Sequence, residues 1–300
     1  MGTHLPAIDA LGTCFRIEVF DDVPQNHLEA AQSSVEVILS QFENQYSRFR
    51  TDSYLSQLNT TGHLQSPSFE LLALLRYGLD AYDRTDGVFN IMIGATLIAQ
   101  GYNNTYSFTA LPHTDIIPDP HDVLTLTADR ITLSHGQIDL GGLGKGYVID
   151  MVAKYLKHEC GFKYFLVNGG GDMYGTSDHD TPITLYLEHP LDTGTYLATT
   201  TIQNQGFAAS SPHKRTWTSG TKTYTHIIDT VKSIPEANQP DATFITAATA
   251  VDADMFATVG LIMSPESFAV IAARESLGMA TYTHRGGFLE ANSRFPVDVS

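Results

Sequence analysis

Cysteine is scarce in this sequence, with Cys14 and Cys160 as its two examples among 300 residues. They lie far apart and match no zinc-ligand spacing, so we expect two free thiols in the core rather than a metal site or a disulfide framework. Long apolar runs are missing as well. No stretch approaches the roughly 18 consecutive apolar residues of a membrane-spanning helix, and no such span is predicted.

Basic residues are also few, at 17 Lys and Arg against 33 Asp and Glu, which gives a formal net charge of −16. This balance makes nucleic acid and anionic membranes poor partners. An acidic protein that binds a phosphate compound must neutralise it locally, and a divalent cation held by carboxylates is the usual means. The charge therefore directs attention to possible metal ligands.

The first ten residues contain neither the basic nor the apolar segment of a secretory signal peptide. We therefore expect the chain as given to be cytoplasmic, with the periplasm or cell surface as the alternative if the N-terminus is truncated. At 42% hydrophobic content, 300 residues can form one large domain or two closely packed lobes. No linker or internal repeat divides the sequence, so we expect a single domain over 1–300.

Hydrophobic periodicity predicts several helices and strands. The expected helices are an amphipathic stripe at 28–46, a short helix capped by Asp52 or Ser53, and segments at 69–84, 147–160 and 250–263, with another opened by Ser264 and Pro265. The expected strands are 11–20, a hairpin of 123–127 with 130–134, and 164–168, 183–188, 196–203, 224–229 and 243–246. Long helices mixed with β-hairpins indicate an α+β fold.

A glycine-rich segment, DLGGLGKGYVID, runs from Asp139 to Asp150 and leads into one of these helices. Glycines before a helix allow a ligand to approach the backbone, and the free N–H groups of the helix favour an anion. Lys145 adds a positive charge at the same place. The spacing is neither a P-loop, because Gly146 follows Lys145, nor a dinucleotide fingerprint. A phosphate site and a plain tight connection both remain open.

Asp254 and Thr258 are four residues apart and share one face of a mostly apolar, and therefore buried, predicted helix. A buried carboxylate is costly unless it is paired or bound to a metal. Carboxylate and hydroxyl oxygens suit Mg²⁺ or Ca²⁺, whereas the alternative is stabilisation of Asp254 by the helix N-terminus. Asp252 is the better candidate for capping. His226 lies in a predicted apolar strand and fits either a core or a catalytic role.

With these motifs in place, the sequence resembles the FAD:protein FMN transferases, the ApbE-type flavin transferases. The resemblance covers nearly the whole length. It is carried in order by Ser47-Arg48-Phe49 with Ser53 and Leu58-Asn59, Gly87-Val88-Phe89-Asn90 with Gly94, the segment Asp139–Asp150, Val167-Asn168-Gly169-Gly170, His226-Ile227-Ile228-Asp229, and Ala253-Asp254 with Thr258.

The resemblance implies an ApbE-like fold with mixed sheets, packed helices and two lobes around a central FAD cleft. It also implies a Mg²⁺-dependent reaction in which a Thr or Ser hydroxyl of a target flavoprotein attacks the FMN phosphorus of FAD and AMP leaves. Asp254, Thr258 and the carbonyl of Gly142 would bind the metal, with Asp254 and His226 as catalytic residues, His226 activating the hydroxyl. The expected FAD contacts are Leu11, Phe49, Val88, Phe89, Asn90, Asp139, Lys145 and Ile227.

The sequence departs from the family pattern at a few positions. Asn90 stands where Asp is common, and Thr230-Val231-Lys232-Ser233 replaces a Pro-x-x-Gly after Asp229. Leu11 stands where Met is frequent, and Phe49 stands where an aromatic residue such as Tyr is usual.

Two other functions remain as alternatives: hydrolysis of FAD to FMN and AMP, and binding of FAD without turnover. A monomer and a homodimer are both compatible with the sequence.

Overall fold

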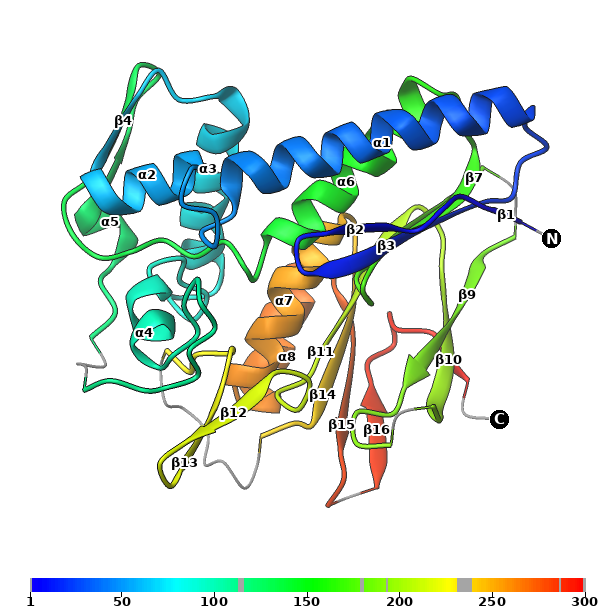
Figure 1. Cartoon of the computed structure of the whole chain (residues 1–300). Coiled ribbons are helices and arrows are strands. Elements are labelled where there is room, and N and C mark those ends of the chain that lie inside the picture. Colours follow the sequence, from blue (N-terminus) through cyan, green and yellow to red (C-terminus); the bar gives the residue numbers. More distant parts are fainter. Residues whose placement is uncertain are drawn as a thin grey trace.

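The computed structural model describes residues 2–112, 116–178, 181–192, 194–230, 239–285 and 287–298. Figure 1 shows a broad layer of strands with helices across one side and a further group of helices beside it. Strands and helices are segregated rather than alternating, and the α+β prediction is confirmed. Strand pairing in the described residues is antiparallel, apart from an isolated parallel bridge between Ile93 and Gln137.

The main sheet comprises nine strands in the described residues, in the order β1-β3-β7-β8-β11-β14-β15-β16, with β2 paired to β3. They are β1 (Thr3–His4), β2 (Ile8–Ala10), β3 (Thr13–Val19), β7 (Tyr164–Gly169), β8 (Met173–Ser177), β11 (Gln205–Ser210), β14 (Ala242–Ala247), β15 (Gly278–Thr283) and β16 (Phe288–Ala291). Alternate residues of β7 are buried, as expected for a strand with one face on the main core. The predicted strands at 164–168 and 243–246 are thus confirmed.

Helices α6 (Gly144–His158) and α7 (Ala250–Ile262) pack against one face of this sheet, and α1 (Gln25–Tyr46) packs across α6 (Figure 1). The predicted stripe of α1 faces the core, with Leu28, Val35, Leu39 and Phe42 buried. Helix α7 has no polar face and is buried nearly all round. Helix α8 (Pro265–Arg274) follows it, with Ser264 as the predicted N-cap.

A second group of elements lies between α1 and α6 in the sequence, on the left in Figure 1. It comprises α2 (Tyr54–Thr61), β4 (His63–Gln65), α3 (Phe69–Arg84), α4 (Gly94–Ala99), α5 (Pro120–Val123), β5 (Leu124–Leu126) and β6 (Arg130–Leu133). Strands β4, β6 and β5 form a small sheet that includes the predicted hairpin. Ser53, one of the two predicted caps, accepts a backbone N–H at the start of α2, and Ser68 does the same at the start of α3.

The opposite face of the main sheet carries a smaller core. A three-stranded sheet of β9 (Ile183–Glu188), β10 (Tyr196–Ile202) and β17 (Val297–Asp298) contributes Leu185, Leu187 and Ile202, which pack with Phe207 and Phe244 of the main sheet. None of these five core residues lines the cavity described below. The predicted strands at 183–188 and 196–203 are confirmed.

The predicted strand at 224–229 is wrong beyond Thr225. Strands β12 (Thr216–Ser219) and β13 (Lys222–Thr225) form an isolated hairpin, and the chain leaves it at His226. The N–H of Ile227 is bonded to the side-chain oxygen of Thr225 instead of to a neighbouring strand. His226, Ile227 and Ile228 therefore line the cavity described below instead of continuing a sheet.

Both cysteines are free thiols, as predicted, but they are partly exposed rather than fully buried in the core. None of the helices in the described part of the chain is long and apolar enough to cross a bilayer. The expectation of a single domain over 1–300 stays a prediction.

Candidate active site

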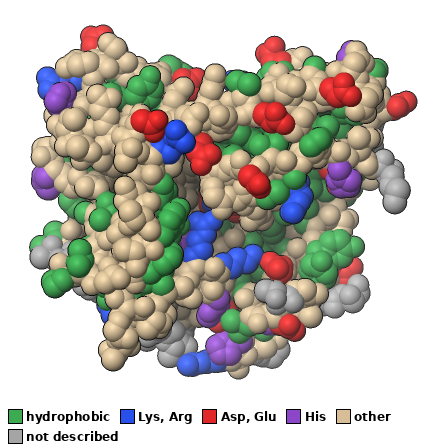
Figure 2. Space-filling view, in the orientation of Figure 1, with side chains coloured by type: hydrophobic (Ala, Val, Ile, Leu, Met, Phe, Trp, Pro, Cys, Tyr) green, Lys and Arg blue, Asp and Glu red, His purple; other side chains and the backbone are tan. Residues whose placement is uncertain are grey.

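A cavity of about 620 Å³ opens between the main sheet and the second group of elements. This volume lies within the usual range for small-molecule sites. Figure 2 shows the hollow near the centre of the view, with Lys and Arg side chains inside it and hydrophobic side chains along one wall. Every residue singled out from the sequence for a site lines this cavity: Leu11, Phe49, Val88, Phe89, Asn90, Asp139, Gly142, Lys145, His226, Ile227, Asp254 and Thr258.

The glycine segment forms the turn that begins α6. At Gly146 an added Cβ would lie 2.5 Å from the carbonyl oxygen of Ala250 and 2.5 Å from the Cα of Val251. Only glycine therefore lets α6 approach the start of α7 this closely. At Gly142 a Cβ would meet the ring of Phe89 at 2.9 Å, whereas Gly144 has ordinary space around it. Close packing thus explains part of the glycine pattern, and the same turn lines the cavity.

Lys145 joins two buried carboxylates at the floor of the cavity. Its Nζ lies 2.7 Å from Asp172 Oδ2 and 3.1 and 3.2 Å from the two carboxylate oxygens of Asp254. Asp254 Oδ2 also accepts the N–H of Gly146 at 3.0 Å. We call Lys145, Asp172 and Asp254 the pocket cluster. Asp172 and Asp254 are 4% and 3% exposed, so both depend on this lysine for charge compensation.

The charges of the pocket cluster perturb one another. Burial opposes the charge on Lys145, but the carboxylates of Asp172 and Asp254 hold its pKa above the ordinary value. Burial raises the pKa of Asp172 to about 6, with Lys145 opposing the shift and Asp254 adding to it. Asp172 was not among the site residues predicted from the sequence. Its signal was a carboxylate directly after three glycines at the end of a buried strand.

The oxygen atoms near Asp254 fit a hard divalent cation. Thr258 lies one turn further along α7, with its hydroxyl 3.4 Å from the carbonyl oxygen of Asp254. A Cβ built on Gly142 would lie 3.9 Å from that hydroxyl, so the glycine turn passes directly beside Thr258. Among the described residues no group of three His, Cys, Asp or Glu side chains could hold a metal alone. One carboxylate, a hydroxyl and a carbonyl suit a Mg²⁺ ion whose coordination a substrate phosphate completes.

Asp139 is engaged by its own surroundings. Its carboxylate forms an ion pair with the Nε of Arg48 and accepts the N–H of Gly141 at 2.7 Å. Arg48 also donates to the carbonyl of Tyr102 at 3.0 Å, and its guanidinium lies 4.2 Å from the ring centre of Phe49. This pair joins the glycine turn to the end of α1, so Asp139 shapes the pocket wall whether or not it touches a ligand.

Asn90 shows why an amide is used at a position where the family commonly has Asp. Its Oδ1 accepts the N–H of Met92 at 2.8 Å, which a carboxylate could also do. Its Nδ2 donates to the carbonyl of Pro118 at 2.9 Å, which an ionised Asp could not do. The amide therefore ties 88–92 to the segment before α5. The altered residues Val231, Lys232 and Ser233 lie outside the described part of the chain.

His226 faces the cavity beside the pocket cluster. Burial, together with the nearby charges of Arg215 and Lys145, lowers the pKa of His226 to about 4. The ring is therefore neutral at pH 7, and one nitrogen has a free lone pair. Its Nδ1 is buried and has no hydrogen-bond partner among the described residues.

An aromatic wall was not predicted from the sequence. It consists of Phe49, Tyr102, Tyr106, Phe108 and Trp217, all of which line the cavity. Phe49 stacks on Tyr106 with ring centres 5.2 Å apart, and Tyr102 stacks on Trp217 at 5.6 Å. The aromatic residues at 102, 106 and 108 lie within one short segment, which was the visible signal in the sequence. Such a wall can stack on a flat ring system.

The cavity also gathers positive charge in an acidic molecule. Arg48, Lys145, Lys214 and Arg215 all line it, against a formal net charge of −16 for the chain. Lys214 pairs with Glu188 at 2.8 Å, and Arg215 donates to the hydroxyl of Tyr102 at 3.3 Å. Glu43, Asp139, Asp172 and Asp254 line the cavity as well, so these charges balance formally, whereas the chain as a whole is strongly acidic.

Comparison with known proteins finds relatives that match this chain over most of its length. The ApbE family model matches residues 11–282. The FAD:protein FMN transferase of Vibrio cholerae is 22% identical over 280 residues, covering 87% of this chain and 82% of the relative. The enzyme of that name from Escherichia coli K12 is 24% identical over 258 residues, covering 80% and 73%.

Solved structures show the same fold. The ApbE protein of Thermotoga maritima superposes with a TM-score of 0.83 at 19% identity, covering 98% of this chain and 97% of its own. The apo form of the Pseudomonas stutzeri flavinyl transferase ApbE gives 0.80 at 18% identity, covering 98% and 95%. The resemblance inferred from sequence motifs is thereby confirmed at the level of family and fold.

Proposed function

This chain belongs to the ApbE family, and we propose that it is a Mg²⁺-dependent FAD:protein FMN transferase. It would attach the FMN part of FAD to a Thr or Ser hydroxyl of a target flavoprotein and release AMP. The observation that carries this proposal is that the pocket cluster and the aromatic wall line the same cavity. A single ligand that carries both phosphates and a flat ring system could contact both groups of residues.

The pyrophosphate of FAD is expected to lie at the glycine turn. Lys145 and the N–H groups that begin α6 offer positive charge and donors there. Asp254, Thr258 and the carbonyl of Gly142 would hold a Mg²⁺ ion, which supplies charge neutralisation for the phosphates. Asp172 keeps Lys145 in place when Asp254 takes a second cation, because its oxygen lies closer to the ammonium.

His226 is proposed to accept the proton of the attacking hydroxyl. The hydroxyl oxygen forms a bond to the FMN phosphorus, the bond from that phosphorus to the AMP oxygen breaks, and AMP departs as the phosphate anion. With its pKa lowered to about 4, His226 is in the accepting form at neutral pH but is a weak base. Bound phosphates would offset the charges of Arg215 and Lys145 and so raise its pKa toward the operating pH.

The isoalloxazine or adenine ring of FAD is proposed to stack on the aromatic wall. The rings of Phe49 and Tyr106 are nearly parallel, with an interplanar angle of 11°, so they already form a stacked surface. Leu11, Val88, Phe89 and Ile227 line the rest of the cavity with apolar groups. These assignments, the compartment and the choice between monomer and homodimer stay predictions.

Incubation with FAD, Mg²⁺ and a candidate acceptor flavoprotein tests the proposal. The expected result is release of AMP together with a mass increase of the acceptor equal to phosphoester-linked FMN. AMP without a labelled acceptor would instead favour FAD hydrolysis. Bound FAD without AMP would indicate a flavin-binding protein without turnover, and either outcome contradicts the transferase.

A further inference from the structure

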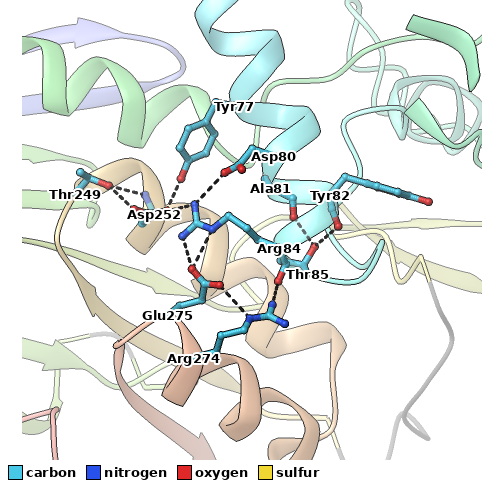
Figure 3. Close-up of polar contacts among 10 residues, drawn as sticks. All are labelled: Tyr77, Asp80, Ala81, Tyr82, Arg84, Thr85, Thr249, Asp252, Arg274 and Glu275. Carbon is cyan, nitrogen blue, oxygen red and sulfur yellow. Dashed lines mark hydrogen bonds and ion pairs between the residues drawn. The ribbon is translucent and has the colours of Figure 1, made fainter. Parts of the chain in front are cut away.

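A second group of charges lies against α7, outside the cavity. Arg84, the last residue of α3, reaches Asp252 through Nη1 at 2.8 Å and Glu275 through Nη2 at 2.8 Å and Nε at 3.0 Å. Arg274 bonds Glu275 at 3.1 Å and donates to the carbonyl of Arg84 (Figure 3). We call Arg84, Asp252, Arg274 and Glu275 the Arg84 cluster. None of its members lines the cavity.

Asp252 is more than the helix cap that its sequence position suggests. One of its oxygens accepts both Arg84 Nη1 and the hydroxyl of Tyr77, the latter at 2.6 Å (Figure 3). The other accepts the hydroxyl of Thr249 at 2.9 Å, while Thr249 caps the backbone of Asp252 in return. Burial opposes the charge on Arg84, but Asp252 and Glu275 hold its pKa above the ordinary value. The contact therefore joins two charged groups.

Helix α7 lacks the single apolar stripe that would by itself define its rotation in the core. A helix with one apolar stripe has a preferred face toward the core, whereas α7 is apolar and buried on almost every side. Apolar packing alone tolerates a rotated helix better than a directional hydrogen bond does. On the cavity side, α7 is held by the bonds of Asp254 to Lys145 and to the N–H of Gly146. Away from the cavity, the polar contacts are those of Asp252 with Arg84 and Tyr77, and those of Asp150 in α6, which accepts the N–H groups at 250 and 251.

The position of Asp254 follows from this rotation. Asp252 and Asp254 are two residues apart, or roughly 200° around the helix, so they project to opposite sides of α7. Asp254 and Thr258 share the side that faces the cavity, where Asp254 meets Lys145. A change in the anchor of Asp252 rotates both oxygen ligands with respect to Gly142.

We infer that Arg84 is a positioning residue, which acts through Asp252 to hold Asp254 and Thr258 at the rotation that cation binding requires. The inference deepens the proposed function and depends on it for its kinetic consequences. Its structural consequence, the location of Asp254 beside Lys145, does not depend on any activity.

The test compares Arg84→Gln, which removes the charge, with Arg84→Lys, which keeps it. Mn²⁺ affinity is measured by electron paramagnetic resonance in the presence of FAD, and transfer kinetics are measured at saturating acceptor. For Arg84→Gln we expect a loss of about tenfold in Mn²⁺ affinity and in kcat, with KM for FAD changed less than about threefold. Arg84→Lys is expected to restore most of both, because one charged contact to Asp252 survives.

Leu64→Ala is the matched control for lost stability. Leu64 is 5% exposed in β4 and does not line the cavity, so its truncation leaves a void without touching α7. We expect it to lower the melting temperature while Mn²⁺ affinity stays at the wild-type value. If Arg84→Gln behaves like Leu64→Ala, Arg84 is only structural and the inference is wrong.

Tyr77→Phe covers the case in which Arg84→Gln does not fold. It removes one hydrogen-bond donor to Asp252 and nothing that lines the cavity, and we expect the affinity for Mn²⁺ to fall about twofold to threefold.

A crystal structure of this variant or of Arg84→Gln should show Asp254 displaced from Lys145. An unchanged contact would overturn the inference, whereas a wild-type protein that binds Mn²⁺ and FAD but transfers no flavin would contradict the proposed function alone.

Discussion

Two groups of charges built on the same plan lie on opposite sides of α7. In the pocket cluster, Lys145 lies between Asp172 and Asp254, and in the Arg84 cluster, Arg84 lies between Asp252 and Glu275. The first lines the cavity and the second does not. They differ in their formal balance, since Arg274 supplies the second group with another positive charge.

This difference indicates what each cluster can do. The pocket cluster has one cation for two buried carboxylates, so it retains a negative charge that favours uptake of a further cation. Its cation is a lysine, a point charge that can exchange partners. The Arg84 cluster has two cations for its two carboxylates, and the exposed Asp80 also lies 3.4 Å from Arg84. The fork of Arg84 bonds Asp252 and Glu275 in fixed directions. The pocket cluster is therefore suited to exchanging cations, and the Arg84 cluster is suited to holding α7 in place.

The largest effect should come from removing the carboxylate that serves both Lys145 and the proposed cation. For Asp254→Ala we expect kcat for flavin transfer to fall by about 10³-fold or more, with loss of Mn²⁺ binding. Asp254→Asn is the control of equal size. Activity is measured by the mass of the acceptor and by AMP release. If Asp254→Ala is still active, the pocket cluster does not have the catalytic role that separates it from the Arg84 cluster.

The burial of His226, together with the nearby charges of Arg215 and Lys145, predicts a pH effect on stability. The pKa of His226 is lowered from 6.5 to about 4, so the unfolded chain binds a proton there more readily than the folded one. Stability should therefore fall as pH drops from about 6.5 to about 4, by at most about 3 kcal/mol. Chemical unfolding of wild type and His226→Gln across this range isolates the contribution. Parallel pH curves for the two proteins would contradict the shift.

Lys145→Ala sharpens the comparison by removing the exchangeable cation. We expect mainly weaker FAD binding, with KM for FAD raised about tenfold to hundredfold, because a charged contact to phosphate is lost. The two carboxylates are then left without their partner, so the melting temperature should fall as well. A fall in kcat at unchanged KM would mean that Lys145 acts in the transition state rather than in binding.

Asp172→Asn should have the smallest effect of these changes. It removes one negative charge from the pocket cluster but leaves Asp254 and a hydrogen bond to Lys145 possible. We expect the affinity for Mn²⁺ in the presence of FAD, measured by electron paramagnetic resonance, to fall about threefold to tenfold. A gain in affinity would show that the surplus charge of the cluster does not favour a cation.

Much of the cavity was accessible from the sequence because its residues lie in local motifs. The glycine segment, the pair of Asp254 and Thr258, and His226 each stand in a short pattern with a physical meaning, and the structure brings them to one cavity. Their roles remain predictions, although their proximity is now observed.

What the sequence did not reveal depends on contacts between distant segments. The aromatic wall combines residues near 49, 102–108 and 217, which share no periodicity. Asp252 met the local criteria for a cap, and nothing near it indicates a partner at Arg84. The strand predicted at 224–229 failed for a similar reason, since apolar alternation does not tell whether a sheet or a cavity buries the residues.

The most direct test is a crystal structure with FAD and Mn²⁺, because the anomalous signal of manganese locates the ion without assumptions. We expect one peak within about 2.5 Å of oxygen atoms of Asp254, Thr258 and Gly142, with the pyrophosphate against Lys145. A pyrophosphate bound elsewhere, or a manganese ion that does not contact Asp254, would contradict this expectation.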